Sequence, residues 1–260
     1  MSDFINISNS RLYFGISIIF FFCGLLNFLV KTQLQKKMVV AFFRSILQLY
    51  LLGLIIMSIF NLKPIYLIAP VMLMILAASF KDGSLKKIEG IFQRYFAIFS
   101  SVVPMGIFTL FIIGTTTFDK PAIVIPIFGM LIGNSLNGVV LGIERFEREI
   151  KSHRELFISD LSIGLTPIYA AKKYIQLSLR AAMTPILNAM SIVGIVSIPG
   201  MMTGQILAGA SPIGASKYQL LILVSIMATI FIGAIIGVLW SLKSYVRNNF
   251  RYLTSELRNG

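Results

Sequence analysis

The long stretches without charge constrain this chain more than any other feature of its sequence. Residues 95–118, 121–143, 181–216 and 218–242 contain no Asp, Glu, Lys or Arg. About 20 consecutive apolar residues are enough for a helix to cross the hydrocarbon core of a bilayer. Only 13% of the residues are charged, whereas a soluble domain has about 25%. The chain is therefore predicted to be an all-α polytopic membrane protein surrounded by lipid.

Seven transmembrane helices account for the apolar segments. Their approximate bounds are 12–30, 38–60, 64–80, 95–117, 121–142, 181–198 and 218–241. The loops between them divide the 23 Lys and Arg residues unevenly, because only Arg11, Lys63, Lys120 and Lys217 reach one side and Arg44 lies inside the second helix. Basic loops mark the cytoplasmic side. The N-terminus is therefore predicted outside and the C-terminus in the cytoplasm. The net charge of +13 is explained by topology, so no nucleic-acid partner is expected.

An uncharged segment near the C-terminus is rich in residues that interrupt helices, among them Pro199, Gly200, Gly204 and Gly209. A full span here would place the basic C-terminal tail outside, so residues 199–216 are predicted to form a re-entrant hairpin. Irregular backbone at membrane depth is tolerated only where protein buries it or water reaches it. The hairpin is expected at a protein-lined cavity or a seam between subunits. Alternatively, its glycines only allow close helix packing.

The longest polar segment covers residues 143–180 and is predicted to be cytoplasmic. Its first part places Glu144 before Arg148 and Glu147 before Lys151, a spacing that stabilises helices. A turn is predicted further on: Gly164 can end one helix, while Thr166 can cap the next, with Pro167 in its first position. Short apolar helices on a polar loop favour docking of another protein. A solvated connector is the alternative.

Several kinds of chemistry have no residues to support them. No acidic residue lies well inside a predicted span, which disfavours a carrier driven by protons or sodium. The chain has no G-x-x-x-x-G-K-[ST] phosphate loop and no His/Cys cluster with metal-ligand spacing. Its single histidine, His153, is expected to be solvated. We therefore expect a protein that is not an enzyme and binds no cofactor itself.

A small set of polar residues lies within the predicted spans or in the hairpin and supplies candidates for a substrate pathway or gate. Arg44 and Gln48 share one helix face, where Arg44 either extends to the interface or acts inside the bundle. Asn134 and Asn137 lie beside glycines, which indicates a helix contact or a pathway. The full candidate set is Arg44, Gln48, Asn134, Asn137, Asn188, Pro199, Gly200, Met201, Met202, Thr203 and Gln205. Met201 and Met202 either bind a soft metal or only pack.

Four segments carry a resemblance to a known family. They are "GMLIGNSLNG" (129–138), "LSIGLTPIYAA" (161–171), "RAAMTPILNAM" (180–190) and "VGIVSIPGMMTGQILAGASP" (193–212). Together they strongly resemble the FetB-type permeases, the membrane subunits of a small ABC transporter family that also has plant relatives linked to aluminium tolerance. The resemblance covers essentially the whole chain.

The resemblance implies a single permease domain over residues 1–260 in the bacterial inner membrane. It implies two copies of this chain, a separate FetA-type ATPase that holds ATP and Mg, and ATP-driven export, with iron or another metal as cargo. The ATPase would dock at Leu161, Gly164, Leu165, Thr166 and Pro167. The alternatives are a stand-alone ion-coupled carrier or channel, a permease for another cargo such as a nucleotide sugar, an importer permease, and a scaffold without transport.

Overall fold

The described part of the chain is almost entirely helical. A computed structural model describes residues 9–30, 35–60, 67–79, 88–114 and 120–259, and within them the only β-type pairing is an isolated bridge between Val193 and Ser197. The chain divides into two units, Met1–Ile59 and Phe60–Gly260. The all-α prediction is confirmed for these residues.

The first unit contains α1 (Asn9–Val30) and all but the last residue of α2 (Gln35–Phe60). In the described residues, four helical segments are long and apolar enough to cross a membrane: Lys36–Leu54, Ile91–Ile113, Pro121–Ser152 and Pro212–Arg247. Phe14–Leu25 and Ile68–Ser79 are shorter apolar helices. These lengths fit a polytopic membrane protein, while the count of seven spans remains a prediction.

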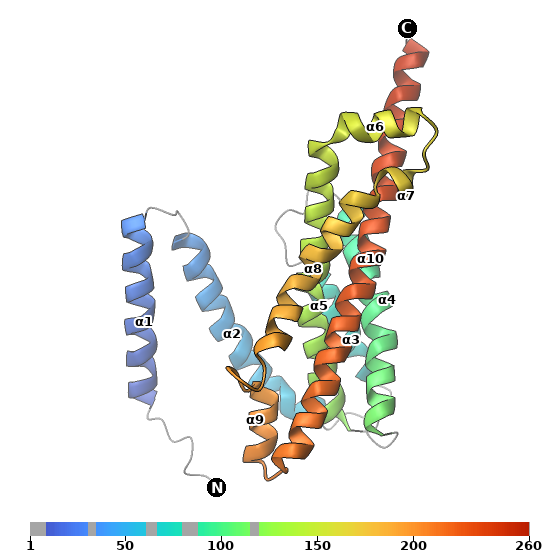
Figure 1. Cartoon of the computed structure of the whole chain (residues 1–260). Coiled ribbons are helices and arrows are strands. Elements are labelled where there is room, and N and C mark those ends of the chain that lie inside the picture. Colours follow the sequence, from blue (N-terminus) through green and yellow to red (C-terminus); the bar gives the residue numbers. More distant parts are fainter. Residues whose placement is uncertain (1–8, 31–34, 61–66, 80–87, 115–119, 260) are drawn as a thin grey trace. The chain divides into compact units, whose positions relative to one another are not determined.

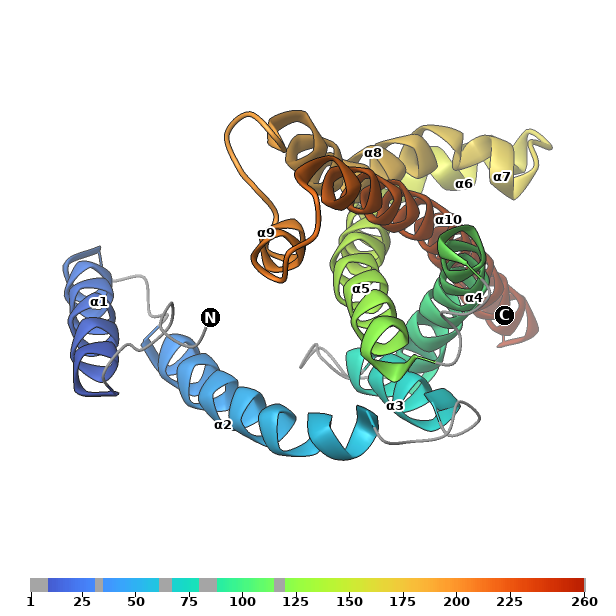
Figure 2. The same cartoon turned by 90° about the horizontal axis from the view of Figure 1, so that it is seen from below.

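The second unit is built around α5 (Pro121–Ser152), which packs against α3 (Ile68–Ser79), α4 (Ile88–Ile113), α8 (Lys172–Ile192) and α10 (Pro212–Asn259). Figures 1 and 2 show α5 among these helices in two views. The fifth predicted span thus continues as one helix to Ser152, as the alternating charges indicated. The last predicted span, 218–241, is the middle of the longer α10.

Glycines and alanines allow α5, α8 and α10 to approach closely. A Cβ atom added to Gly138 would lie 2.5 Å from Ile230 Cγ2 and 3.2 Å from the Ala182 carbonyl oxygen. One added to Gly142 would meet the Cβ atoms of Ala182 and Ala234. Higher residue numbers on α5 therefore meet higher numbers on α10, whereas α8 runs in the opposite direction. Such small-residue contacts are typical of helices that associate within membranes.

The α4–α10 interface contains the clearest polar contacts between helices. Gln93 is buried and donates to the Gly237 carbonyl at 2.8 Å and to Ser241 Oγ at 2.6 Å. Towards the other end, the Thr109 hydroxyl donates to Ser225 Oγ at 2.8 Å. These bonds fix α4 antiparallel to α10. They also satisfy groups whose burial without a partner would be costly.

The predicted sixth span needs a correction. The sequence suggested a helix over 181–198, but α8 already begins at Lys172 and ends at Ile192. Gly194 has φ +83° and its N–H donates to the Ser197 carbonyl at 2.8 Å, so the chain turns here and leaves the helix. Pro185 lies inside α8 without ending it. The apolar residues after Ile192 therefore belong to the hairpin.

Candidate coupling and transport sites

Residues 154–170, which we call the elbow, form the predicted helix–turn–helix. It consists of α6 (Arg154–Ser162), a turn and α7 (Pro167–Ala170), followed directly by α8. Gly164 has φ +93°, a backbone conformation that favours glycine. Its N–H donates to the Leu161 carbonyl and the Leu165 N–H to the Asp160 carbonyl, both at 3.1 Å. This pair of bonds is a Schellman cap.

The start of α7 agrees with the predicted N-cap in its backbone conformation but not in its side-chain hydrogen bond. Thr166 is the N-cap residue in an extended conformation and Pro167 follows it, but the Thr166 side chain makes no capping hydrogen bond. The turn is instead held by the backbone and by the fixed φ of the proline. The expected cap position is therefore right, and the expected role of the hydroxyl is wrong.

A separate hydrophobic cluster, the elbow core, attaches the elbow to three long helices. Its buried members are Phe146, Ile150, Phe157, Ala170, Ala171, Tyr174, Val238 and Leu242. Phe146 of α5 is fully buried, and so nearly is Phe157 of α6. Burial of each such side chain contributes about 1.5–3 kcal/mol. The elbow is thus a packed structure joined to α5, α8 and α10.

His153 lies at the junction between α5 and α6 and is exposed. Its ring stacks on Tyr174 with a centroid distance of 5.5 Å, and Nδ1 lies 3.0 Å from the Glu149 carbonyl. Burial raises the pKa of the Tyr174 hydroxyl above its ordinary value, and the negative charges of Asp160 and Glu149 raise that pKa further. The expectation of a solvated histidine is confirmed, although the ring also contacts Tyr174.

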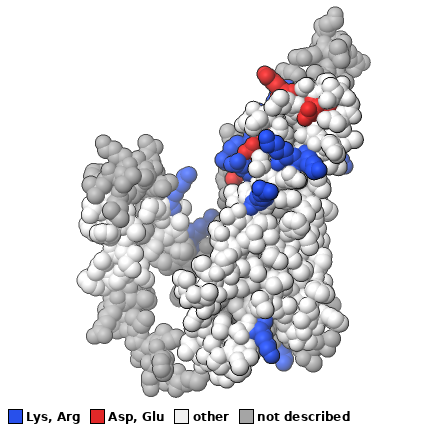
Figure 3. Space-filling model, in the orientation of Figure 1, with Lys and Arg blue, Asp and Glu red and all other residues white. Residues whose placement is uncertain are grey.

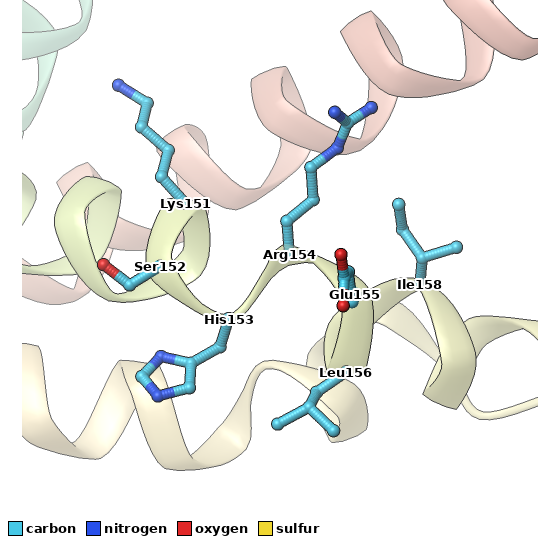
Figure 4. Close-up of a pocket in the computed structure, with 7 residues that line it drawn as sticks. All are labelled: Lys151, Ser152, His153, Arg154, Glu155, Leu156 and Ile158. Atoms are coloured by element: carbon cyan, nitrogen blue, oxygen red, sulfur yellow. The ribbon is translucent and has the colours of Figure 1, made fainter.

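An open pocket of about 520 Å³ lies beside this junction. It is lined by Lys151, Ser152, His153, Arg154, Glu155, Leu156 and Ile158. Figure 4 shows these side chains pointing in different directions from the backbone, with Lys151 and Arg154 on one side and His153 and Leu156 on the other. In the described residues there is no group of three His, Cys, Asp or Glu that could hold a metal. The pocket therefore does not gather ligands around a point.

The apolar residues that the elbow exposes are partly different from those predicted. Leu161 is half-buried and packs against the elbow core. Ile163 is 75% exposed and Tyr169 65%. Leu165, Leu156 and Ile168 are exposed as well. Ile163, Ile168 and Tyr169 were missed as candidate contacts, although large apolar side chains beside a turn in a polar segment could have indicated them.

Charged side chains gather at the elbow end of the second unit. Figure 3 shows them over the elbow and the neighbouring end of α8, then a surface without charge, then basic side chains near α9. On α5, Lys151 and Glu147 form the predicted ion pair at 3.6 Å, and Arg145 pairs with Glu149 at 2.7 Å. Lys120 and Lys217 lie at the opposite end, because α5 and α10 run in parallel. Within the described residues of the second unit, this distribution matches the predicted sorting.

The predicted pathway amides lie on exposed helix faces. Asn134 and Asn137 are exposed on α5, and Asn188 is exposed on α8. The Asn134 side chain donates to its own helix, at the Met130 carbonyl, 2.8 Å away. Arg44 and Gln48 are exposed on α2, in the first unit.

The predicted hairpin, 199–216, has different bounds in the structure, because α8 ends at Ile192 and α10 begins at Pro212. We call residues 193–212 the hairpin, and its turn resembles that of the elbow. Pro199 is the N-cap of α9 (Gly200–Leu207). Gly209, with φ +95°, donates to the Ile206 carbonyl, and Ala210 donates to the Gln205 carbonyl. This second Schellman cap leads to Pro212, the first residue of α10. Pro199, Gly200 and Gly209 therefore lie where helices start or stop, whereas Gly204 lies inside α9 and does not interrupt it. Whether the hairpin re-enters the membrane stays a prediction.

The candidate gate residues of α9 lie at the edge of the fold. No residue of α9 is buried in the single chain. Met201 is half-buried and packs against the main core, while Met202 and Gln205 are half-buried and Gly200 and Thr203 exposed. The Thr203 hydroxyl donates to the Pro199 carbonyl at 3.2 Å. Packing thus accounts for Met201, and metal binding by either methionine remains untested.

Several known proteins are similar in sequence to this chain over most of its length. It is 35% identical over 225 residues to the UPF0014 membrane protein YjkA of Bacillus subtilis (strain 168), covering 84% of this chain and 88% of the relative. It is 29% identical over 233 residues to the probable iron export permease protein FetB of Escherichia coli (strain K12), covering 88% of each. It is 28% identical over 201 residues to Protein ALUMINUM SENSITIVE 3 of Arabidopsis thaliana, covering 76% and 73%.

No solved structure matches the chain. The model of an uncharacterised protein family, UPF0014, matches residues 11–246. This match includes the elbow, the hairpin and the helices between them. The chain therefore belongs to the UPF0014 family of membrane proteins.

Proposed function

We propose that this chain is the membrane-spanning permease subunit of an ATP-driven ABC exporter. Two copies would work with a separate FetA-type ATPase, which holds ATP and Mg. The name of the FetB relative, a probable iron export permease, supports the permease role and makes iron or another metal the first cargo to test. The name of the plant relative refers to aluminium sensitivity.

The observation that carries this proposal is the elbow. Ile163 and Tyr169 are exposed around a capped turn, at the end of the unit where charges gather. Lys172 lies 5.5 Å from the Tyr169 ring centroid, so a basic group borders the apolar patch. Aromatic residues in an apolar centre with a polar rim are typical of protein interfaces. The turn residues Leu161, Gly164, Leu165, Thr166 and Pro167 hold this patch in shape, and Leu165 also contributes to it.

The elbow core would transmit movement. If ATP closes the ATPase pair, the docked elbows move together. Because Phe157 packs with residues of α5, α8 and α10, these helices would follow as one body. Rigid-body movement of this kind is a common way to couple distant sites. The elbow end would face the cytoplasm of a bacterial inner membrane, with the N-terminus outside.

Co-purification with the ATPase tests the proposal. Ile163→Asp and Tyr169→Asp place a carboxylate in the patch without removing buried atoms, and we expect each to weaken ATPase binding by about tenfold or more. Ser216→Asp adds the same charge at an exposed position near the opposite end and serves as the matched control. Wild-type binding by both patch variants would rule out docking at the elbow.

Transport is tested separately, in vesicles that contain this chain and the ATPase. ATP-dependent movement of a metal or its chelate out of the compartment that holds ATP is the expected result. Movement that needs only an ion gradient, with no ATPase added, would favour a stand-alone carrier instead.

A further inference from the structure

The exposed face of α8 carries a continuous line of polar residues. Arg180, Thr184, Asn188 and Ser191 are all exposed. Their spacing places them on one side of a helix with 3.6 residues per turn. The opposite side holds the buried residues of α8, which are Tyr174, Ser178, Ala182 and Ile186. We call the exposed line the α8 stripe.

The α8 stripe runs along a part of the bundle that has little charge. Gly142 of α5 lies against Ala182, against the Ser178 carbonyl and against Ala234 of α10. Arg180, between Ser178 and Ala182, is therefore level with Ala234. The first basic residue beyond Ala234 on α10 is Lys243, about 13 Å further along that helix at 1.5 Å per residue. Arg180 is therefore the last charged residue on α8 before the uncharged run 181–216.

Two of the four groups of the α8 stripe are not used by the fold. In the described residues Arg180 forms no ion pair, and the amide of Asn188 has no hydrogen-bond partner. The hydroxyls of Thr184 and Ser191 donate to carbonyls of their own helix, at 2.7 and 2.8 Å. An amide without a partner is costly in hydrocarbon, and Arg180 lies at the end of the predicted sixth span, next to the uncharged run 181–216. The stripe is therefore expected to face water or a solute.

The neighbouring helix offers the same chemistry. Asn134 and Asn137 lie on the exposed face of α5, and the Asn137 amide has no partner in the described residues. Gly133 lies beside them, and a Cβ atom there would meet nothing within 4 Å. Amides and hydroxyls can donate hydrogen bonds to oxygen atoms of a solute.

We propose that the α8 stripe lines a path for an anionic, oxygen-rich solute, with Arg180 as its first contact at the elbow end. This inference rests on the proposed transport function and adds the charge of the cargo. A bare divalent cation is better served by carboxylate oxygens or imidazoles, and the stripe has neither, while Arg180 repels a cation. Iron carried along this path would travel as an anionic chelate.

Direct binding to the purified full-length chain tests whether the α8 stripe prefers an anionic solute. This measurement does not need the ATPase. The probes are citrate, ferric citrate and ferrous ion alone, measured by equilibrium dialysis in detergent. Ferric citrate and citrate are expected to bind, and ferrous ion is not. Loss of a charge-assisted hydrogen bond corresponds to about a tenfold or larger change in affinity, so Arg180→Gln is expected to weaken binding of both anions by about that factor. Arg180→Lys is expected to retain most of it.

Asn188→Asp gives the sharpest test because it changes charge and almost no volume. For an anionic solute it weakens binding, again by about tenfold. For a bare cation it leaves binding unchanged or strengthens it. Lys243→Gln, which removes an exposed cation from α10, is the matched control and is expected to bind like the wild type.

Two results would overturn the inference. One is binding of ferrous ion that Asn188→Asp improves. The other is no binding of either anion to a chain that still assembles with its ATPase. Loss of ATPase assembly in the wild type would instead contradict the proposed function, and the dialysis result would stand on its own.

Discussion

The elbow and the hairpin use the same local chemistry for different packing. Each has a Schellman cap at a glycine with positive φ, Gly164 in one and Gly209 in the other, and each continues into a helix that begins with a proline. The elbow has a hydrophobic core of its own, whereas no residue of α9 is buried. Turn chemistry therefore sets where the chain reverses, and buried area decides how firmly the reversal is held.

The largest effect is expected when one buried or half-buried side chain is removed from each region. Phe157→Ala would leave a cavity in the elbow core and is expected to cost about 3–5 kcal/mol. Met201→Ala removes a half-buried side chain at the hairpin and is expected to cost about 1 kcal/mol. Hydrogen exchange of residues 153–171 and 196–212 in detergent would measure both. Similar increases in exchange at the two sites would contradict the comparison.

A smaller effect is expected at the two turn glycines. Gly164→Ala and Gly209→Ala each force a side chain into positive φ, at a cost of about 1–2 kcal/mol. A Cβ atom meets nothing within 4 Å at either position, so backbone strain is the only difference. Equal shifts in thermal midpoint would support identical turn chemistry. If Gly164→Ala alone destabilises the chain, the turns are not equivalent.

The smallest effect concerns alkaline pH at the elbow. The raised pKa of Tyr174 means that the unfolded chain loses this proton at lower pH than the folded chain. The contribution of Tyr174 to the free energy of unfolding is therefore complete below the ordinary pKa of 10.0. It declines as pH rises above that value. Tyr174→Phe is expected to be nearly neutral at pH 7 and to reduce the loss of elbow protection above pH 10. An unchanged alkaline profile would remove Tyr174 as the cause.

Features that depend on neighbouring residues in sequence could be predicted well. Gly164, Thr166 and Pro167 indicated the elbow turn, and uncharged runs indicated the helices. Packing between distant residues could not be predicted in this way. Gly233, for example, meets Val139 and Ser101 at distances that exclude a side chain, yet nothing local distinguishes it from other glycines.

The exposure of apolar side chains in the elbow was missed for the same reason. Leu161 is as apolar as Ile163, and only the tertiary fold shows that the first packs inwards and the second outwards. The end of α8 at Ile192 was missed because the residues after it remain apolar. Hydropathy records where lipid is tolerated, and it does not record where the backbone leaves a helix.

The packing of α5 has a mechanical consequence. This single helix of 32 residues is about 48 Å long at 1.5 Å per residue. Its buried residues extend from Pro121 to Ile150, so neighbouring helices hold it at both ends as well as near Gly138. A rod held along its whole length cannot pivot about one point, so a displacement of the elbow end is expected to carry the opposite end with it.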